Sequence, residues 1–207
     1  MLHLNPEREQ KLKRAAAYRQ HDLSVILENV HDPHNLGAVM RTCDCVGISE
    51  IFVIYTEQGV NSNARYIGIN SASGSKKWVD VHFFESVPEC IEAVKPKYHR
   101  ILGTHLSFDA TSIYETDLAG PVVLAFGNEH TGLSNELLQY VDGNVIIPQY
   151  GMVQSLNISV ACAVSLFEAS RQRSLLGKYA SQFDENNPMH REYYQKMLKG
   201  HNPRAFP

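Results

Sequence analysis

Short β-type runs alternate with helical patterns along most of this chain, and this alternation constrains the fold more than any other feature. Apolar runs rich in Val, Ile, Leu and Phe predict strands at Ser24–Glu28, Ile51–Tyr55, Val81–Phe84, Arg100–Thr104, Val122–Phe126 and Asn144–Ile147. Helical patterns lie over residues 5–20, 35–46, 86–95, 133–140 and 188–199 and from Ile158 onward. Strands separated by helices indicate an α/β fold, with a mostly parallel sheet covered by helices on both faces.

The organisation of the chain follows from its length and its ends. A chain of 207 residues with 43% apolar and 20% charged residues suits one globular domain with short additions. Asn5 followed by Pro6 is a helix start, and a polar stretch over 175–187 precedes the last helical pattern. We expect an N-terminal helical extension over residues 1–22, an α/β domain over 23–175, and a linker with a C-terminal helix over 176–207. Residues 57–77, rich in Gly, Ser and Asn, predict loops around a short helix.

The charge balance does not by itself indicate a nucleic-acid-binding protein. The net charge is −3 and the isoelectric point is about 6.4. Basic residues are concentrated near the two ends of the chain, in three groups: Arg8, Lys11, Lys13, Arg14 and Arg19; Arg171, Arg173 and Lys178; and Arg191, Lys196, Lys199 and Arg204. Such groups are either solvated helix faces or a local surface for phosphates, and both interpretations stay open at this point.

Cysteine usage and hydropathy bear on location. The four cysteines, Cys43, Cys45, Cys90 and Cys162, show neither a CxxC pair nor a Cys/His spacing that would hold a metal. Free thiols in a reducing cytosol account for them, so we expect a cytoplasmic protein without a metal site. No apolar run approaches the roughly 18 residues of a membrane span, and the first residues lack the apolar core of a signal peptide.

Residues 147–164, IPQYGMVQSLNISVACAV, combine a polar loop with the start of an apolar helix. The helix is apolar almost all round, which is typical of a buried helix. Asn157 is a good N-cap residue, and Ser155 stands just before it. Polar side chains and free backbone N–H groups at the start of a buried helix are typical of a small-ligand site. An ordinary capped loop is the alternative.

Two further polar segments follow predicted strands. Residues 32–41, DPHNLGAVMR, place Asn35 and Arg41 on one predicted helix that begins at Asn35, and we expect both side chains to serve one cleft. Residues 126–134, FGNEHTGLS, place Glu129 between two glycines that permit tight turns. No GxGxxG and no GxxxxGK[ST] occurs, so neither a dinucleotide fold nor a P-loop is indicated. Three polar segments in order, each at the carboxyl end of a strand, favour a binding site there.

Together these segments resemble a known family. The patterns N-x-G-x-x-x-R, G-N-E-x-x-G and I-P-x-x-G-x-x-x-S-L-N-x-S-x-A are similar to the three motifs of the SpoU branch of the SPOUT RNA methyltransferases. Here they are Asn35, Gly37 and Arg41; then Gly127, Asn128, Glu129 and Gly132; then Ile147, Pro148, Gly151, Ser155, Leu156, Asn157, Ser159 and Ala161. The resemblance covers about residues 24–170. The segment GMVQSLNISVA and the basic N-terminal helix are most similar to the TrmH type, which methylates the ribose 2′-oxygen of guanosine 18 in the D-loop of tRNA.

The resemblance implies a fold, a cofactor and a set of site residues. The fold would carry a trefoil knot in the C-terminal part of residues 23–175, S-adenosylmethionine would be the cofactor, and the protein would act on tRNA as a homodimer. Matching positions assign catalytic roles to Arg41, Asn35, Glu129, Ser155 and Asn157, and cofactor contacts to Thr104, Gly127, Ile147 and Leu156. RNA binding is expected to fall to the terminal helices, with Arg8, Lys11, Arg19, His34, Arg171 and Arg173 as the contacts. A guanidinium is a poor general base, so Arg41 is expected to act through its charge.

Two alternatives to tRNA guanosine-18 methylation stay open. One is a sister SpoU enzyme for ribosomal RNA or for the tRNA wobble nucleotide. Relatives of the first kind usually carry an extra N-terminal domain, for which the residues before Asn35 leave little room, and relatives of the second kind generally lack the basic N-terminal helix. The other is a catalytically silent RNA-binding relative, against which the intact motif residues argue.

Overall fold

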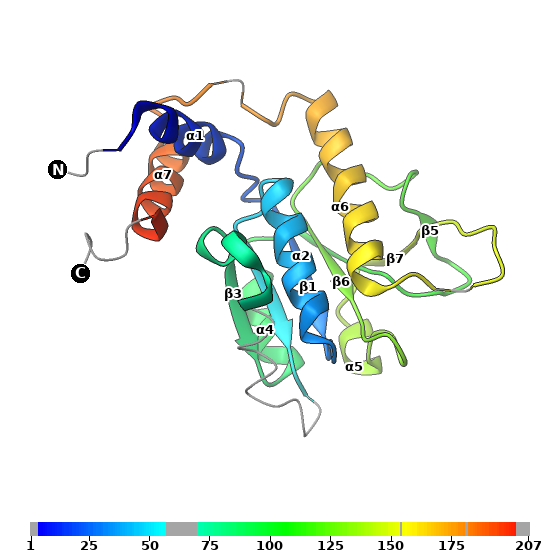
Figure 1. Cartoon of the computed structure of the whole chain (residues 1–207). Helices are drawn as coiled ribbons and strands as arrows, with labels where there is room; N and C mark the ends of the chain where they lie inside the picture. Colours follow the sequence, from blue (N-terminus) through cyan, green and yellow to red (C-terminus); the bar gives the residue numbers. More distant parts are fainter. Residues whose placement is uncertain (1–3, 57–69, 154, 181, 202–207) are drawn as a thin grey trace.

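The protein is an α/β sandwich built on a parallel sheet (Figure 1). The structure is a computed structural model and describes residues 4–56, 70–153, 155–180 and 182–201. Seven strands lie in the order β3-β2-β1-β6-β4-β7-β5, and every pairing is parallel. They are β1 (Leu23–Glu28), β2 (Glu50–Ile54), β3 (Asp80–Phe84), β4 (Arg100–Gly103), β5 (Thr111–Ser112), β6 (Val122–Phe126) and β7 (Gly143–Ile146).

The helices fall close to their predicted positions. They are α1 (Pro6–Ala17), α2 (Pro33–Cys45), α4 (Val87–Val94), α5 (Asn135–Leu138), α6 (Ile158–Leu175) and α7 (Pro188–His201), with a short 3-10 helix, η1 (Ser73–Lys77). The α/β class is therefore confirmed, and the six predicted strands lie within one residue of their observed ends. Strand β5 was not predicted, because two residues cannot show an alternating pattern. Most of the predicted loop region 57–77, namely residues 57–69, lies outside the described residues.

In the sheet, strands from late in the sequence lie between strands that precede them in the sequence. Strand β6 lies between β1 and β4, and β7 lies between β4 and β5. The carboxyl ends of β4, β6 and β7 are therefore neighbours, although the three strands are far apart in the sequence. The trefoil knot that the resemblance implies stays a prediction.

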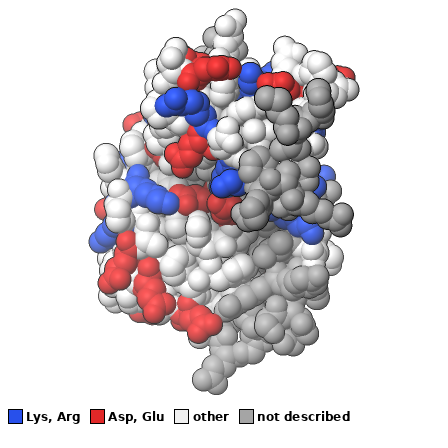
Figure 2. All heavy atoms as spheres, turned by 90° about the vertical axis from the view of Figure 1, so that its left-hand side faces the viewer, with Lys and Arg blue, Asp and Glu red and all other residues white. Residues whose placement is uncertain are grey.

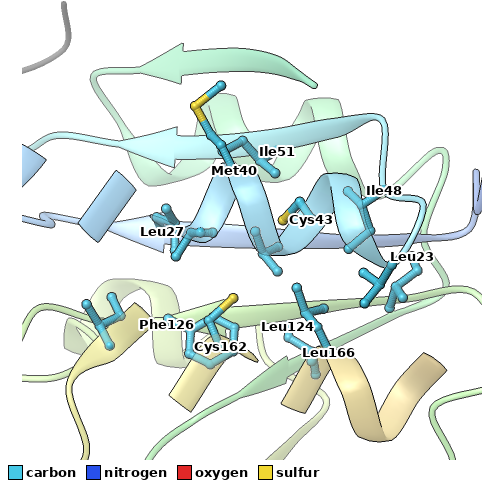
Figure 3. Close-up of a cluster of buried hydrophobic side chains, with 14 of the residues drawn as sticks. Leu23, Leu27, Met40, Cys43, Ile48, Ile51, Leu124, Phe126, Cys162 and Leu166 are labelled. Carbon is cyan, nitrogen blue, oxygen red and sulfur yellow. The ribbon is translucent and has the colours of Figure 1, made fainter. Parts of the chain in front are cut away.

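Side-chain alternation along the strands divides the core into two layers. On β1, Val25 and Leu27 join a cluster with α2 and α6, whereas Ile26 between them joins a cluster with α4 and α5 on the opposite face. Figure 3 shows the first cluster, in which Cys43 of α2 and Cys162 of α6 point toward the sheet. Because both faces are covered at the centre of the sheet, β6 is a continuous apolar run, and every residue of β1 and β6 is buried.

Helix α6 departs from the expectation that an all-round apolar helix is buried. Its Cys162, Leu166 and Ala169 face the core and are fully buried, but Val160 is 47% and Phe167 57% exposed. The reason is that α6 forms part of an outer layer, where the sheet and α2 can cover only one side of it (Figure 1). The other side of α6 stays apolar and exposed in the single chain.

Helices α1 and α7 pack together at the amino-terminal ends of β2 and β3, away from the carboxyl ends of the strands (Figure 1). Their contact buries Leu12 and Ala16 of α1 against Met197 of α7. The α1 start is the predicted one, since Asn5 accepts a hydrogen bond from the Glu7 N–H and Pro6 occupies the first helical position. The Lys196 ammonium donates to the Asp80 carboxylate at the start of β3 and so attaches α7 to the sheet.

Candidate functional site

A cavity of about 410 Å³ opens at the carboxyl ends of β4, β6 and β7. Thr104, Gly127 and Ile147 directly follow these three strands and line it, and Leu156 lines it from the segment before α6. The lining is mixed: Phe126 and Val145 are among its apolar residues, and Asn128 and Glu129 are among its polar ones. The four residues that the resemblance assigns to the cofactor therefore surround one cavity, at the edge of the sheet where α/β proteins bind ligands.

The Gly127–Ser134 loop forms one wall of this cavity and turns back tightly on itself. Asn128 and Gly132 form an isolated antiparallel bridge, and the Asn128 side-chain oxygen accepts hydrogen bonds from the N–H groups of His130 and Thr131 at 2.8 and 2.7 Å. A Cβ atom on Gly127 would lie only 2.0 Å from the carbonyl carbon of Gly132. Glycine is thus required at 127 by close backbone approach, and backbone atoms form this wall.

Three side chains connect the three sequence motifs beside the cavity. The Asn35 amide nitrogen donates to the Glu129 carboxylate at 2.6 Å, and the Asn35 oxygen accepts from the Asn157 amide nitrogen at 3.2 Å. Asn157 is the N-cap of α6, as predicted, because its oxygen accepts from the Ser159 N–H at 2.9 Å. The donors run in one direction, from α6 through the two asparagines to the carboxylate. Ser155 lines the cavity next to this chain of hydrogen bonds.

Helix α2 begins two residues earlier than predicted. Asp32 is its N-cap, accepting from the His34 N–H at 2.8 Å, and Pro33 is its first residue. An Asp-Pro pair at these positions is a stronger start signal than an asparagine two residues later. Asn35 is consequently inside the helix, 7% exposed, and its amide is used for the contact between motifs rather than for capping.

Arg41 does not border the cavity with Asn35. The six residues between them on α2 rotate the side-chain direction by about 600°, so the two side chains point about 120° apart. Arg41 is exposed, absent from the cavity wall, and makes no hydrogen bond or ion pair with any residue that the structure describes. The expectation that Asn35 and Arg41 face one cleft within the single chain is therefore corrected, while the Arg41 charge is accessible to a ligand from solvent.

Two of the six predicted RNA contacts are buried and do not fit that role. Arg173 has no exposed surface, and all five of its N–H groups are used: they reach Gln20, the Asp22 carboxylate and carbonyl, and the carbonyls of Leu118 and Gly120. Arg19 is 8% exposed and donates to the Ile48 carbonyl and the Asp44 carboxylate, each at 2.7 Å. Both guanidinium groups form hydrogen bonds and ion pairs inside the protein, so neither belongs to the candidate RNA surface.

The buried ion pair between Arg173 and Asp22 also changes the pKa of the Asp22 carboxylate. Burial alone would raise the pKa of Asp22, but the hydrogen bonds and charges of Arg173 and Lys178 outweigh burial and hold this pKa below its ordinary value near 3.8. The other predicted contacts lie at the surface: Lys11, His34 and Arg171 are exposed, and Arg8 is half-buried. Arg171 is held by Glu168, whose carboxylate accepts two hydrogen bonds from it at 2.8 Å.

One contact at the site was missed from the sequence. Glu28, the last residue of β1, has no exposed surface and accepts two hydrogen bonds from Ser134, at the end of the Gly127–Ser134 loop. A glutamate that ends an otherwise apolar strand is a visible signal, because a strand covered on both faces has no solvent for a charge. Across the part of the chain that the structure describes, no cluster of three or more His, Cys, Asp or Glu side chains could hold a metal ion, and no helix is long and apolar enough to cross a membrane.

The fold and the site define an α/β protein with a cavity at the carboxyl edge of a parallel sheet, beside which hydrogen bonds link helix α2, the Gly127–Ser134 loop and the start of helix α6. Comparisons with known proteins then give the family. The sequence model of the SpoU rRNA Methylase family matches residues 22–167, and the chain belongs to this family.

Similar proteins cover nearly the whole chain. A Thermus thermophilus protein named tRNA (guanosine(18)-2′-O)-methyltransferase is 41% identical over 192 residues, which are 92% of this chain and 93% of that protein. The crystal structure of the A. aeolicus TrmH/SpoU tRNA modifying enzyme aligns with a TM-score of 0.75 at 32% identity, covering 93% of this chain and 96% of that one. The SpoU methyltransferase AviRb from Streptomyces viridochromogenes, solved in complex with the cofactor AdoMet, aligns with a TM-score of 0.67 at 26% identity over 76% of this chain and 62% of that one.

Proposed function

We propose that this protein transfers a methyl group from S-adenosylmethionine to the ribose 2′-oxygen of guanosine 18 in tRNA. The observation that carries the proposal is the hydrogen-bonded chain Asn157–Asn35–Glu129, which joins the three family motifs at the rim of one cavity. The relative that shares 41% of its residues over nearly the whole length is named for this reaction. Membership of the family supports the reaction class, and this relative supports the choice of tRNA.

The cavity suits S-adenosylmethionine in size and chemistry. Its volume of about 410 Å³ falls within the range of small-ligand pockets. Phe126, Ile147 and Leu156 supply apolar surface for an adenine ring, and the tight turn at Gly127 presents backbone atoms to the ligand. Among the lining residues that the structure describes, Glu129 is the carboxylate and no Lys or Arg occurs, which suits a cationic sulfonium. When bound, the cofactor supplies an electrophilic methyl group.

The polar residues have two roles: Arg41 supplies a charge that is accessible to the substrate, and the hydrogen-bonded side chains of Asn35, Asn157 and Glu129 hold the site in position. Arg41 acts through its charge, stabilising negative charge that develops on the 2′-oxygen or holding an RNA phosphate that accepts the proton. Asn35 and Asn157 fix the Glu129 carboxylate relative to α2 and α6, and Ser155 faces the same space. Such a site must hold the ribose oxygen and the methyl group about 3 Å apart. It must also stabilise the negative charge that develops on the oxygen, because the ribose hydroxyl is a poor acid.

The tRNA surface is assigned to Arg8, Lys11, His34 and Arg171. Figure 2 shows basic and acidic side chains interspersed on the face that includes α1 and α7, so the charge that would meet phosphates is local rather than general. Phosphate contacts make affinity dependent on salt. We therefore expect tRNA affinity to fall steeply between low and moderate salt, and an affinity that stays constant would contradict this assignment.

We also propose that the protein is a homodimer and that it works in the cytoplasm. The outer side of α6 exposes Val160 and Phe167, and the nearby loop before α6 exposes Tyr150, Met152 and Val153 at 68–99%. A second copy of the chain would cover these apolar side chains, which a monomer rarely leaves exposed together. The four cysteines are free thiols, which is consistent with a reducing compartment.

Methyl transfer from labelled S-adenosylmethionine to unmodified tRNA transcripts tests the proposal. The expected product is 2′-O-methylguanosine at position 18, mapped by nuclease digestion and mass spectrometry, with a transcript that carries a 2′-deoxyguanosine at that position as the unreactive control. Methylation at the wobble nucleotide or of ribosomal RNA would move the chain to a sister enzyme. Absence of transfer to any of these RNAs despite cofactor binding would refute the enzymatic proposal.

A further inference from the structure

Glu28 has a buried carboxyl group, and its hydrogen-bond partner among the residues that the structure describes is Ser134. It has no exposed surface, and its two carboxylate oxygens accept hydrogen bonds from the Ser134 N–H at 2.8 Å and the Ser134 hydroxyl at 2.6 Å. A carboxylate buried in this way persists only where its hydrogen bonds are well made. Both bonds go to the residue that ends the Gly127–Ser134 loop.

Ser134 transmits this attachment to two neighbouring elements. Its hydroxyl oxygen accepts from the Leu137 N–H at 3.1 Å and so caps α5. The preceding residue, Leu133, packs at the end of β4, where a Cβ on Gly103 would lie 2.9 Å from the Leu133 side chain. The position of Ser134 therefore influences the course of the chain into Thr104, which lines the cavity.

The loop is attached at two points to the same short segment. Its middle is held by the Glu129–Asn35 hydrogen bond, and its end is held by the Ser134–Glu28 pair. Glu28 and Asn35 flank the connection between β1 and α2, so the two contacts fix the loop against that connection from both sides. Loss of the Ser134–Glu28 contact leaves the Glu129–Asn35 hydrogen bond as the remaining contact described here between the loop and the β1–α2 connection, while the Asn128–Gly132 bridge acts only within the loop.

We infer that Glu28 and Ser134 are positioning residues, which hold the Gly127–Ser134 loop in the conformation that binds the cofactor and presents Glu129. The inference rests on the proposed function. Neither residue touches the reacting atoms, and neither belongs to the residues assigned above to catalysis or to cofactor contact.

Ser134→Ala tests the inference, with Ser86→Ala as its matched control. Ser86 is likewise the serine N-cap of a short helix, α4, and accepts from the Glu89 N–H at 3.4 Å, but it contacts neither the loop nor the cavity. Cofactor affinity is measured by calorimetry, kcat and the KM for tRNA by methyl transfer, and folding by thermal unfolding. Ser134→Ala is expected to raise the Kd for S-adenosylmethionine at least tenfold and to lower kcat, with the KM for tRNA unchanged. Ser134→Thr, which keeps the hydroxyl, is expected to restore both values to within threefold.

The outcomes separate positioning from general stability. Equal effects of Ser86→Ala and Ser134→Ala on cofactor affinity, or wild-type affinity and kcat in a folded Ser134→Ala protein, would overturn the inference. Ser134→Gly repeats the test if the alanine variant unfolds, because glycine is a tolerated N-cap that also lacks the hydroxyl. Failure of the wild-type protein to bind S-adenosylmethionine would instead reject the proposed function, so the two failures are distinguishable.

Discussion

Replacing Arg173 by methionine is expected to destabilise the folded protein without directly lowering its affinity for tRNA. Arg173 has no exposed surface, and its five N–H groups bind five oxygen acceptors from two segments, the one before β1 and the one before β6. Methionine fills a similar volume but donates no hydrogen bond. The substitution therefore removes the Arg173 donors from the carbonyls of Leu118 and Gly120 and leaves the Asp22 carboxylate with Lys178 as its remaining charged partner.

The size of the effect follows from these contacts. Removing one member of a buried ion pair costs about 3–5 kcal/mol. Asp22 is not completely enclosed, with 13% of its side chain exposed, and it keeps its bond to Lys178 at 3.1 Å. The lower part of the range applies, about 3 kcal/mol, which corresponds to a fall in Tm of roughly 6–12 °C for a chain of this length.

Urea unfolding at pH 7 measures this free energy, with Arg171→Met as the control. Arg171 is the exposed neighbour, and its pairing with Glu168 is worth at most about 1 kcal/mol in solvent. All variants are compared at one protein concentration, because dimer formation would make stability depend on concentration. A folded Arg173→Met protein with wild-type stability and weakened tRNA binding would refute the reasoning, since that result requires a guanidinium at the surface.

Three further predictions concern the candidate site and the Arg173–Asp22 ion pair. Arg41→Lys keeps a positive charge but loses the planar fork, so kcat is expected to fall at least tenfold in the methyl-transfer assay while S-adenosylmethionine still binds; full turnover would remove Arg41 from catalysis. Gly127→Ala places a methyl group 2.0 Å from the Gly132 backbone, so calorimetry is expected to detect no cofactor binding, whereas wild-type affinity would contradict the tight turn. Because the pKa of Asp22 is lowered in the folded protein, its ion pair stabilises the fold above about pH 4, and this stabilisation is lost as the pH falls through the folded-state pKa. The difference in unfolding free energy between wild type and Arg173→Met should therefore shrink over that range, whereas a difference independent of pH would show that the carboxylate charge plays no part.

The sequence was a good guide to elements and a poor guide to the burial of charged side chains. Strand β6 was evident because burial on both faces makes its residues a continuous apolar run. Arg171 and Arg173 look equivalent in the sequence, yet they differ by about 200° in direction on α6, so one meets solvent and the other the interior. Only the packing of the α6 end against the segments around Gln20 and Gly120 decides which is which.

In the candidate site too, the sequence predicted local structure but not the contacts between distant residues. Local sequence identified Asn157 as an N-cap and Gly127 as a turn, because caps and turns depend on adjacent residues. The contacts of Asn35 with Glu129 and with Asn157 join positions 94 and 122 residues apart, and no local pattern contains them. The family resemblance named these three residues together, and their hydrogen bonds to one another are visible only in the structure.

The direction of the hydrogen bonds explains why asparagines, rather than aspartates, occupy positions 35 and 157. Glu129 as a carboxylate can only accept, so the neighbouring side chain must donate toward it and accept on its other side. The Asn35 amide does both, and Asn157 repeats the arrangement between Asn35 and the free N–H groups at the start of α6. An aspartate at 35 would place two carboxylates where a 2.6 Å hydrogen bond now lies, and an alanine would leave both neighbours unpaired. The polar chain therefore works as a unit, with the amino-terminal end of α6 supplying donors at one end and the carboxylate beside the cavity accepting at the other.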